Sequence, residues 1–210
     1  MKAKSSKVLI DGAVGQLELR VLEGRAGSNE SIKPSLVVIS HPHPEFGGTM
    51  NNKVVTTLER SFQNLGFSTV TYNFRGVEAS EGAYDGGVGE QVDLQTVVAW
   101  ARQNVEFAQL VLAGFSFGAY VTLATQSKLQ ADRLLIVAPP VGLYDFSGME
   151  EVTVPWEMIV GLEDEVVEVD EMMGWAMSRE FKPSLYCRSQ ASHFFHGQLI
   201  WLKKMINSLY

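Results

Sequence analysis

A serine flanked by glycines at both second neighbours stands at position 116, inside the run Gly-Phe-Ser-Phe-Gly of residues 114–118. A serine hydroxyl becomes a nucleophile when a neighbouring base takes its proton. This glycine spacing is typical of a tight turn from a strand into a helix, which lifts the hydroxyl clear of the sheet. The same turn aims the next backbone N–H, that of Phe117, at a developing oxyanion. The run therefore predicts Ser116 as a catalytic nucleophile.

A base for this serine is expected among the histidines that follow it, because such turns take their partners in the chain order serine, acid, histidine. Of the four histidines, only His193 and His196 come after Ser116. His193 comes first after the last predicted strand, on the loop that leads to the final helix. We therefore predict His193 as the general base and expect His196 to cap that helix or to lie at the surface.

The acid that orients the histidine is expected on a loop just beyond a strand between these two points. Residues 161–167 directly follow a predicted strand over residues 156–160, and they hold three successive carboxylates. We favour Asp164, with Glu163 and Glu165 as alternatives. Serine, acid and histidine would each then stand at the end of a different strand.

Apolar runs and helical periodicities alternate along the chain, which predicts an α/β fold with a mainly parallel sheet and helices on both faces. An N-terminal antiparallel hairpin is expected to turn at Asp11-Gly12, and a polar loop is expected over residues 24–33. About 17 residues separate the strands predicted over residues 134–138 and 156–160, which is too few for a cap domain. The predicted strands cover residues 16–21, 36–39, 68–72, 110–113, 134–138, 156–160 and 185–188. The predicted helices run from a cap at Asn51 or Asn52 to Leu65, and over residues 92–105, 119–126, 169–179 and 199–209.

Bulk composition narrows the class of protein. The 210 residues suit a single domain over residues 1–210, with 46% hydrophobic and 20% charged residues. A net charge of −7 argues against nucleic acid or an anionic membrane as partner. The most apolar stretch, residues 110–124, is shorter than the roughly 20 residues of a membrane span. With Cys187 as the one cysteine and no apolar leader, a cytoplasmic protein is expected.

Further motifs carry a family resemblance. They are the loop His-Pro-His-Pro-x-x-Gly-Gly-x-x-x-Asn at 41–52, Asn-Phe-Arg-Gly at 73–76, Ser-Glu-Gly at 80–82, Asp-Glu-Val-Val at 164–167 and His-Phe-Phe at 193–195. With these the chain resembles, over nearly its whole length, small capless bacterial α/β hydrolases of the dienelactone-hydrolase-like group. The resemblance implies an α/β-hydrolase fold and hydrolase chemistry. Dienelactone hydrolase itself uses a cysteine nucleophile where this chain has Ser116, so its substrate is not carried over.

The His-Pro-His-Pro loop follows the first buried strand, where this fold places its second oxyanion donor. Pro42 and Pro44 have no N–H, so the donor must come from a neighbour such as His43 or Glu45, and we favour His43. A metal site on His41 and His43 is the alternative, but no third ligand stands at suitable spacing. No metal and no cofactor are therefore expected.

Two further expectations concern the surroundings of the serine. Arg75 is predicted to tie the loop after its strand to a carboxylate such as Asp93, with substrate binding as the alternative. Aromatic side chains are expected to flank an open site and to receive an apolar acyl or aryl group. The substrate-binding candidates are Phe46, Phe115, Tyr144 and Phe194.

Together these residues predict hydrolysis of an ester-type bond in a small molecule, through a Ser-His-Asp triad and an acyl-enzyme. Thioester or peptide hydrolysis on the same triad is one alternative. A non-catalytic binding protein of the same fold is the other. A monomer and a homodimer are both compatible with the sequence.

Overall fold

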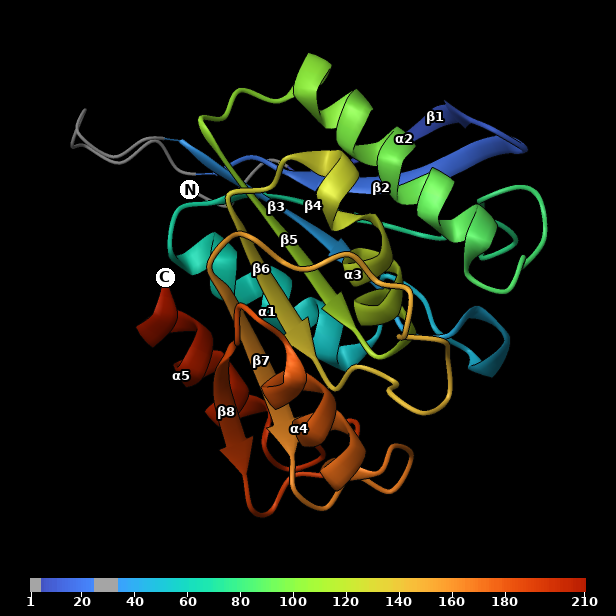
Figure 1. Ribbon diagram of the computed structural model, residues 1–210. Helices are drawn as coiled ribbons and strands as arrows, with labels where there is room; N and C mark the ends of the chain where they lie inside the picture. Colours follow the sequence, from blue (N-terminus) through green and yellow to red (C-terminus); the bar gives the residue numbers. More distant parts are fainter. Residues whose placement is uncertain (1–4, 25–33) are drawn as a thin grey trace.

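A computed structural model describes residues 5–24 and 34–210 and contains an eight-stranded sheet with helices on both faces (Figure 1). The strands follow one another across the sheet in the order β1-β2-β4-β3-β5-β6-β7-β8. This arrangement places β5 in the interior of the sheet and β8 at one edge. The strands are β1 (Ser5–Gly12), β2 (Gly15–Leu22), β3 (Ser35–Ser40), β4 (Ser68–Tyr72), β5 (Gln109–Phe115), β6 (Arg133–Val137), β7 (Trp156–Gly161) and β8 (Ser184–Arg188).

The sheet is parallel from β4 to β8 and antiparallel at its N-terminal end, as predicted, because β2 pairs antiparallel with both β1 and β4. The predicted hairpin turn was wrong by two residues. Asp11 and Gly12 belong to β1, and the chain turns at Ala13 and Val14. Gly15 takes the positive φ of 127° after the turn, a conformation that glycine adopts at no steric cost. Apart from Gly24, the polar loop expected over residues 24–33 lies outside the described residues.

The helices follow the predicted order, with one notable difference in α2. This helix begins at Val88, four residues before the predicted start at residue 92. The carboxylate of Glu90 accepts the N–H groups of Asp85 and Gly87 at 2.9 and 2.8 Å and so fixes the earlier start. The helices are the short η1 (Pro44–Phe46), α1 (Lys53–Asn64), α2 (Val88–Asn104), α3 (Phe117–Leu129), α4 (Val169–Ser178) and α5 (Leu199–Leu209).

Two apolar layers hold the helices against the sheet (Figure 1). On one face α1 and α5 bury residues such as Leu58 and Ile206. On the other face α2, α3 and α4 bury residues such as Val97, Val121 and Met172. Each fully buried side chain of this size contributes about 1.5–3 kcal/mol of transfer free energy. The sheet is therefore a rigid base for the loops at the carboxyl ends of its parallel strands.

Two features bear on where the chain can act. Between β6 and β7 the described residues form no helix and no strand beyond an isolated bridge at Val141, so no cap stands over the sheet there. Among the residues described, no helix combines the length and the apolar character that crossing a bilayer requires.

Candidate active site

Ser116 stands at the carboxyl end of β5, where the chain turns directly into α3. Its backbone has φ 54° and ψ −122°, a conformation that costs a residue with a side chain free energy. Both flanking glycines are sterically required. A Cβ on Gly114 would overlap the carbonyl oxygen of Gly118, and a Cβ on Gly118 would overlap that of Ser40 on β3. Close packing of turn, helix and neighbouring strand therefore explains the glycine spacing.

The structure brings together the three residues that the sequence singled out. His193 Nε2 lies 2.9 Å from Ser116 Oγ, and His193 Nδ1 lies 2.7 Å from Asp164 Oδ2. The side chains of His193 and Asp164 are almost fully buried. The other carboxylate oxygen of Asp164 accepts the N–H groups of Val166 and Val167 at 2.9 and 2.8 Å. These two bonds orient the carboxylate, so the hydrogen-bonded chain from Asp164 to Ser116 has a fixed direction.

The alternatives for acid and base lie elsewhere. His196 is exposed, and its ring stacks on that of Phe194 at 5.9 Å. Glu163 is exposed, and only its backbone N–H takes part in a hydrogen bond of the described residues. Glu165 accepts the backbone N–H of His193 at 3.0 Å rather than meeting the imidazole. Sequence reasoning missed this contact, because it depends on how two distant loops meet.

The two residues whose backbone groups are predicted to bind an oxyanion lie in neighbouring segments. Phe117 is the first residue of α3, and His43 is the cap of η1. Their rings are 5.2 Å apart, so the two segments are in contact. Within the described residues, neither backbone N–H donates a hydrogen bond. Their role as oxyanion donors stays a prediction, with which these unoccupied N–H groups are compatible.

His41 fixes the loop that carries His43. Its Nε2 accepts the N–H of Phe74 at 3.0 Å, and its Nδ1 donates to the carbonyl of Pro42 at 2.6 Å. Burial lowers the pKa of His41 to about 3, so the ring is neutral. Both ring nitrogens are used in this way, which disfavours the metal alternative for His41. In the described part of the chain, no group of three His, Cys, Asp or Glu side chains is placed to hold a metal.

We expect His41 to make stability depend on pH. Its pKa rises from about 3 in the folded state to about 6.5 in the unfolded state, so at intermediate pH only the unfolded chain carries the extra proton. The free energy of unfolding should therefore fall as pH decreases from about 6 to about 4, by up to about 1.4 kcal/mol per pH unit from this group. Urea unfolding across this range checks the slope. His41→Gln should flatten it, and equal slopes for the two proteins would contradict the assignment.

Arg75 has the structural role that the sequence predicted. Asp93 on α2 accepts from the Nη2 and Nε of Arg75 at 2.7 and 3.1 Å, and from its backbone N–H at 3.0 Å. Both side chains are buried. This pair ties the loop after β4 to α2. One further guanidinium nitrogen, Nη1, lies 3.9 Å from Asp85.

One predicted substrate contact was wrong. Phe115 is fully buried in the layer beneath the sheet, and its ring packs against that of His193 at 5.2 Å. Its ring supports the imidazole by packing against it, and none of its side chain is exposed for contact with a substrate. Phe194 is half-buried and lies beside the same imidazole, with ring centroids 5.0 Å apart. Phe194 is thus placed at the edge of the site, as a substrate contact requires.

An aromatic wall stands on the His43 side of the serine. We use this name for His43, Phe46, Tyr84, Phe117 and Tyr144. The His43 ring lies between 4.6 and 6.4 Å from the other four rings. Phe46 is 86% exposed, and the hydroxyls of Tyr84 and Tyr144 are 3.2 Å apart. Tyr84 was not among the sequence candidates, although it lies after a strand, as Phe46, Tyr144 and Phe194 do.

A hollow of about 270 Å³ lies beside the aromatic wall. Glu45, Arg75 and Tyr84 are among the residues that line it. Because the rings of Tyr84 and His43 are 4.7 Å apart, the hollow adjoins the loop that carries His43.

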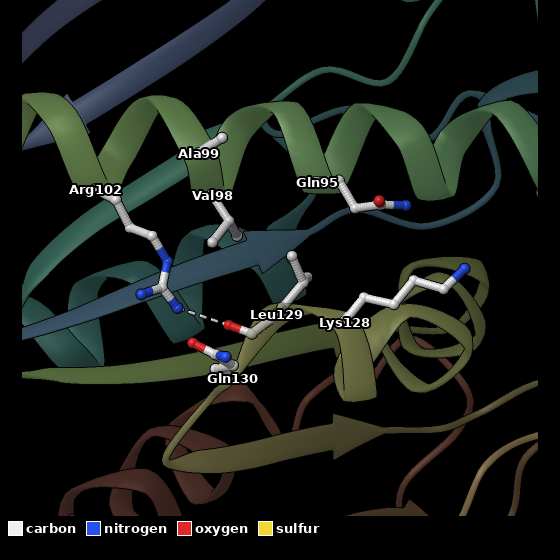
Figure 2. A pocket seen from close by; sticks show the side chains of 7 residues that line it. All are labelled: Gln95, Val98, Ala99, Arg102, Lys128, Leu129 and Gln130. Atoms are coloured by element: carbon white, nitrogen blue, oxygen red, sulfur yellow. Dashed lines mark hydrogen bonds between the residues drawn. The ribbon is translucent and has the colours of Figure 1, made fainter.

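A second hollow, of about 370 Å³, lies far from the serine, between α2 and the end of α3 (Figure 2). Gln95, Arg102 and Lys128 line it, and Arg102 donates to the carbonyl of Leu129 at 2.7 Å. The length of α3, at 1.5 Å per residue, separates it from Ser116 by roughly 20 Å. The larger hollow is therefore no part of the candidate site.

Comparisons with known proteins show the family of the chain. The family described as X-Pro dipeptidyl-peptidase (S15 family) matches residues 29–172. An uncharacterized protein of Rickettsia prowazekii is 32% identical over 196 residues, which are 89% of this chain and 82% of that protein.

Solved structures match over nearly the whole chain. An α/β serine hydrolase without a lid from Xanthomonas campestris is 37% identical, with a TM-score of 0.91 over 99% of this chain and 94% of its own. An α/β serine hydrolase homologue from Coxiella burnetii is 38% identical, with a TM-score of 0.89 over 100% of this chain and 98% of its own. The predicted α/β-hydrolase fold without a cap is thus confirmed, whereas the dienelactone-hydrolase-like subgroup stays a prediction.

Proposed function

This chain belongs to the X-Pro dipeptidyl-peptidase (S15) family of serine hydrolases, and from that premise we propose that it hydrolyses an ester-type bond of a small molecule. Ser116 is the nucleophile, His193 the base and Asp164 the orienting acid. One observation carries the proposal, namely the two hydrogen bonds of 2.9 and 2.7 Å that link these side chains in line. The reaction needs no cofactor.

The first step forms an acyl-enzyme. Ser116 Oγ attacks the carbonyl carbon while His193 Nε2 takes the hydroxyl proton. Nε2 can accept this proton because Asp164 holds the neutral ring with its hydrogen on Nδ1. The imidazolium that forms is stabilised by the buried carboxylate. As the tetrahedral intermediate collapses, His193 gives the proton to the leaving alkoxide, and the alcohol departs.

The negative charge on the carbonyl oxygen is met by the N–H groups of Phe117 and His43. Each such donor contributes about 3–4 kcal/mol in related acyl-transfer enzymes. The N-terminus of α3 adds a favourable partial charge at the same place. In the second step, water attacks the ester carbonyl of the acyl-enzyme as His193 takes its proton. The carboxylic acid leaves and the Ser116 hydroxyl is restored.

The surroundings of Ser116 support an apolar acyl or aryl group as the part of the substrate that is bound. The aromatic wall lies on one side, and Phe194 lies beside the imidazole on the other. Phe117 itself is buried, but Phe46 is exposed and the other aromatic side chains are half-buried, and covering such surface with a flat apolar group is favourable. We further propose that the reaction takes place in the cytoplasm, in keeping with Cys187 as the one cysteine.

Peptide hydrolysis is a second candidate, favoured by the description of the matching family as X-Pro dipeptidyl-peptidase. The same nucleophile, base and oxyanion donors would serve an amide. The difference would lie in the leaving group, because His193 must then protonate an amine.

Labelling with a fluorophosphonate probe tests the proposal, with the adduct located by mass spectrometry. We expect one adduct, on Ser116, and none in Ser116→Ala. Rates with p-nitrophenyl acetate and butyrate, compared with alanyl-prolyl-p-nitroanilide, then separate an esterase from a peptidase. Folded protein that takes no label and turns over no ester would reject the proposal in favour of a binding protein.

A further inference from the structure

Hydrogen bonds and a close backbone approach connect the loop that carries the acid to the segment that carries the base. We call residues 162–168 the acid loop and residues 189–198 the histidine loop. At the start of the acid loop, the N–H of Leu162 donates to the carbonyl of Arg188, the last residue of β8, at 2.9 Å, and the N–H of Glu163 donates to the carbonyl of Ala191 in the histidine loop at 3.0 Å. Gly161 makes this approach possible, because a Cβ there would overlap the carbonyl of Ala191. The two loops therefore form one unit.

Glu165 makes the last connection of this series. Its Oε2 accepts the backbone N–H of His193 at 3.0 Å, while the adjacent Asp164 binds Nδ1 of the same residue at 2.7 Å. His193 is thus held at its main chain and at its ring by two consecutive carboxylates. In the hydrogen bonds of the described residues, the His193 N–H has no other acceptor. Among the described residues, the main-chain N–H of His193 is therefore held by the side chain of Glu165 alone.

We propose that Glu165 is a positioning residue that sets the distance between His193 and Ser116 through this hydrogen bond. The proposal rests on the proposed hydrolase function. An imidazole bonded only through Nδ1 can still pivot about that bond, and its Nε2 then moves away from Ser116 Oγ. A second bond, at the main chain, holds in place the backbone from which the ring extends, and so limits how far Nε2 can move. Small displacements of a base are costly, because proton transfer requires a heavy-atom distance of about 2.6–3.2 Å.

Two substitutions separate the hydrogen bond from the charge. Glu165→Gln keeps an oxygen acceptor for the His193 N–H and removes the charge, whereas Glu165→Ala removes both. Glu163→Gln is the matched control, because it removes an equal charge from the same loop without touching His193. We expect Glu165→Ala to lower kcat for p-nitrophenyl butyrate roughly 3- to 10-fold, as the loss of one hydrogen bond implies, with KM unchanged. Glu165→Gln and Glu163→Gln should stay within about twofold of the unchanged protein.

A purely structural role for Glu165 would give a different pattern. The melting temperature would fall in Glu165→Ala, but kcat would not, and that result would overturn the proposal. Equal losses of kcat in Glu165→Gln and Glu165→Ala would also overturn it, because the charge and not the hydrogen bond would then be responsible.

Amide hydrogen exchange at His193 tests the same contact without any turnover. Exchange should be faster in Glu165→Ala than in Glu165→Gln or in the unchanged protein, and equal rates would overturn the proposal. A protein that neither takes the fluorophosphonate label nor turns over esters would refute the proposed hydrolase function. If exchange at His193 were then still slower in the unchanged protein than in Glu165→Ala, the contact with Glu165 would stand. Failure of the hydrolase function can thus be told apart from failure of the contact.

Discussion

Replacing Ser116 with glycine should lower kcat by roughly 10⁴-fold or more and, at the same time, raise the free energy of unfolding by about 1 kcal/mol. Activity is lost because the nucleophile is removed. Stability is gained because Ser116 has φ 54° and ψ −122°, where a residue with a Cβ is strained and glycine is not. The gain is reduced by the larger conformational entropy of glycine in the unfolded chain. Urea unfolding and ester turnover on the same preparations check both effects.

Ser116→Ala is the matched control for this prediction. It removes the hydroxyl but keeps the Cβ, so kcat should fall as far while the strain remains. We therefore expect its free energy of unfolding to lie within about 0.5 kcal/mol of the unchanged protein. If the glycine variant were less stable than the alanine variant, strain at the turn would not be the cause.

Asp164→Asn should lower kcat by roughly 10⁴-fold, as in a related triad, with little change in structure. The asparagine oxygen can still accept the N–H groups of Val166 and Val167, as Oδ1 does now. Its NH₂ group would then face His193 Nδ1 and donate to it. The ring hydrogen would move to Nε2, which faces Ser116, and the imidazole could no longer accept the hydroxyl proton.

Single-turnover kinetics with p-nitrophenyl acetate, together with the melting temperature, measure this effect. Glu163→Gln, which neutralises the adjacent carboxylate, should leave kcat within about twofold. A loss of less than tenfold in Asp164→Asn would show that the acid lies elsewhere.

Local sequence predicted much of the fold. The strand over residues 68–72 and the helix over residues 199–209 were predicted with the bounds that the structure has. The first is a run of residues that favour strands, and the second has apolar residues at helical spacing. The first turn was wrong because Asp11-Gly12 is a favoured turn pair, while Gly15 provides the positive φ in the folded protein. The early start of α2 was missed because glycines conceal the helical pattern before Glu90, whose side chain caps the helix.

The candidate site was predictable where it depends on chain order and on the ends of strands. Ser116, Asp164 and His193 each follow a strand of one parallel sheet, so sequence alone could place them at the same edge. Packing across the sheet could not be predicted in this way. Phe115 alternates into the buried layer, and Glu165 meets His193 only because two loops converge.

The order of strands in the sheet places the parts of the site in regions of unequal stability. Ser116 follows the interior strand β5, but Asp164 and His193 follow β7 and β8, the last two strands, and the side chains of β8 are half-buried or exposed. The sheet edge formed by β7 and β8 can unfold locally, as one cooperative unit, while the rest of the molecule stays folded. Esterase activity should therefore disappear at a lower urea concentration than the helical circular-dichroism signal. The enzyme would then be switched off by partial unfolding that leaves its nucleophile in place.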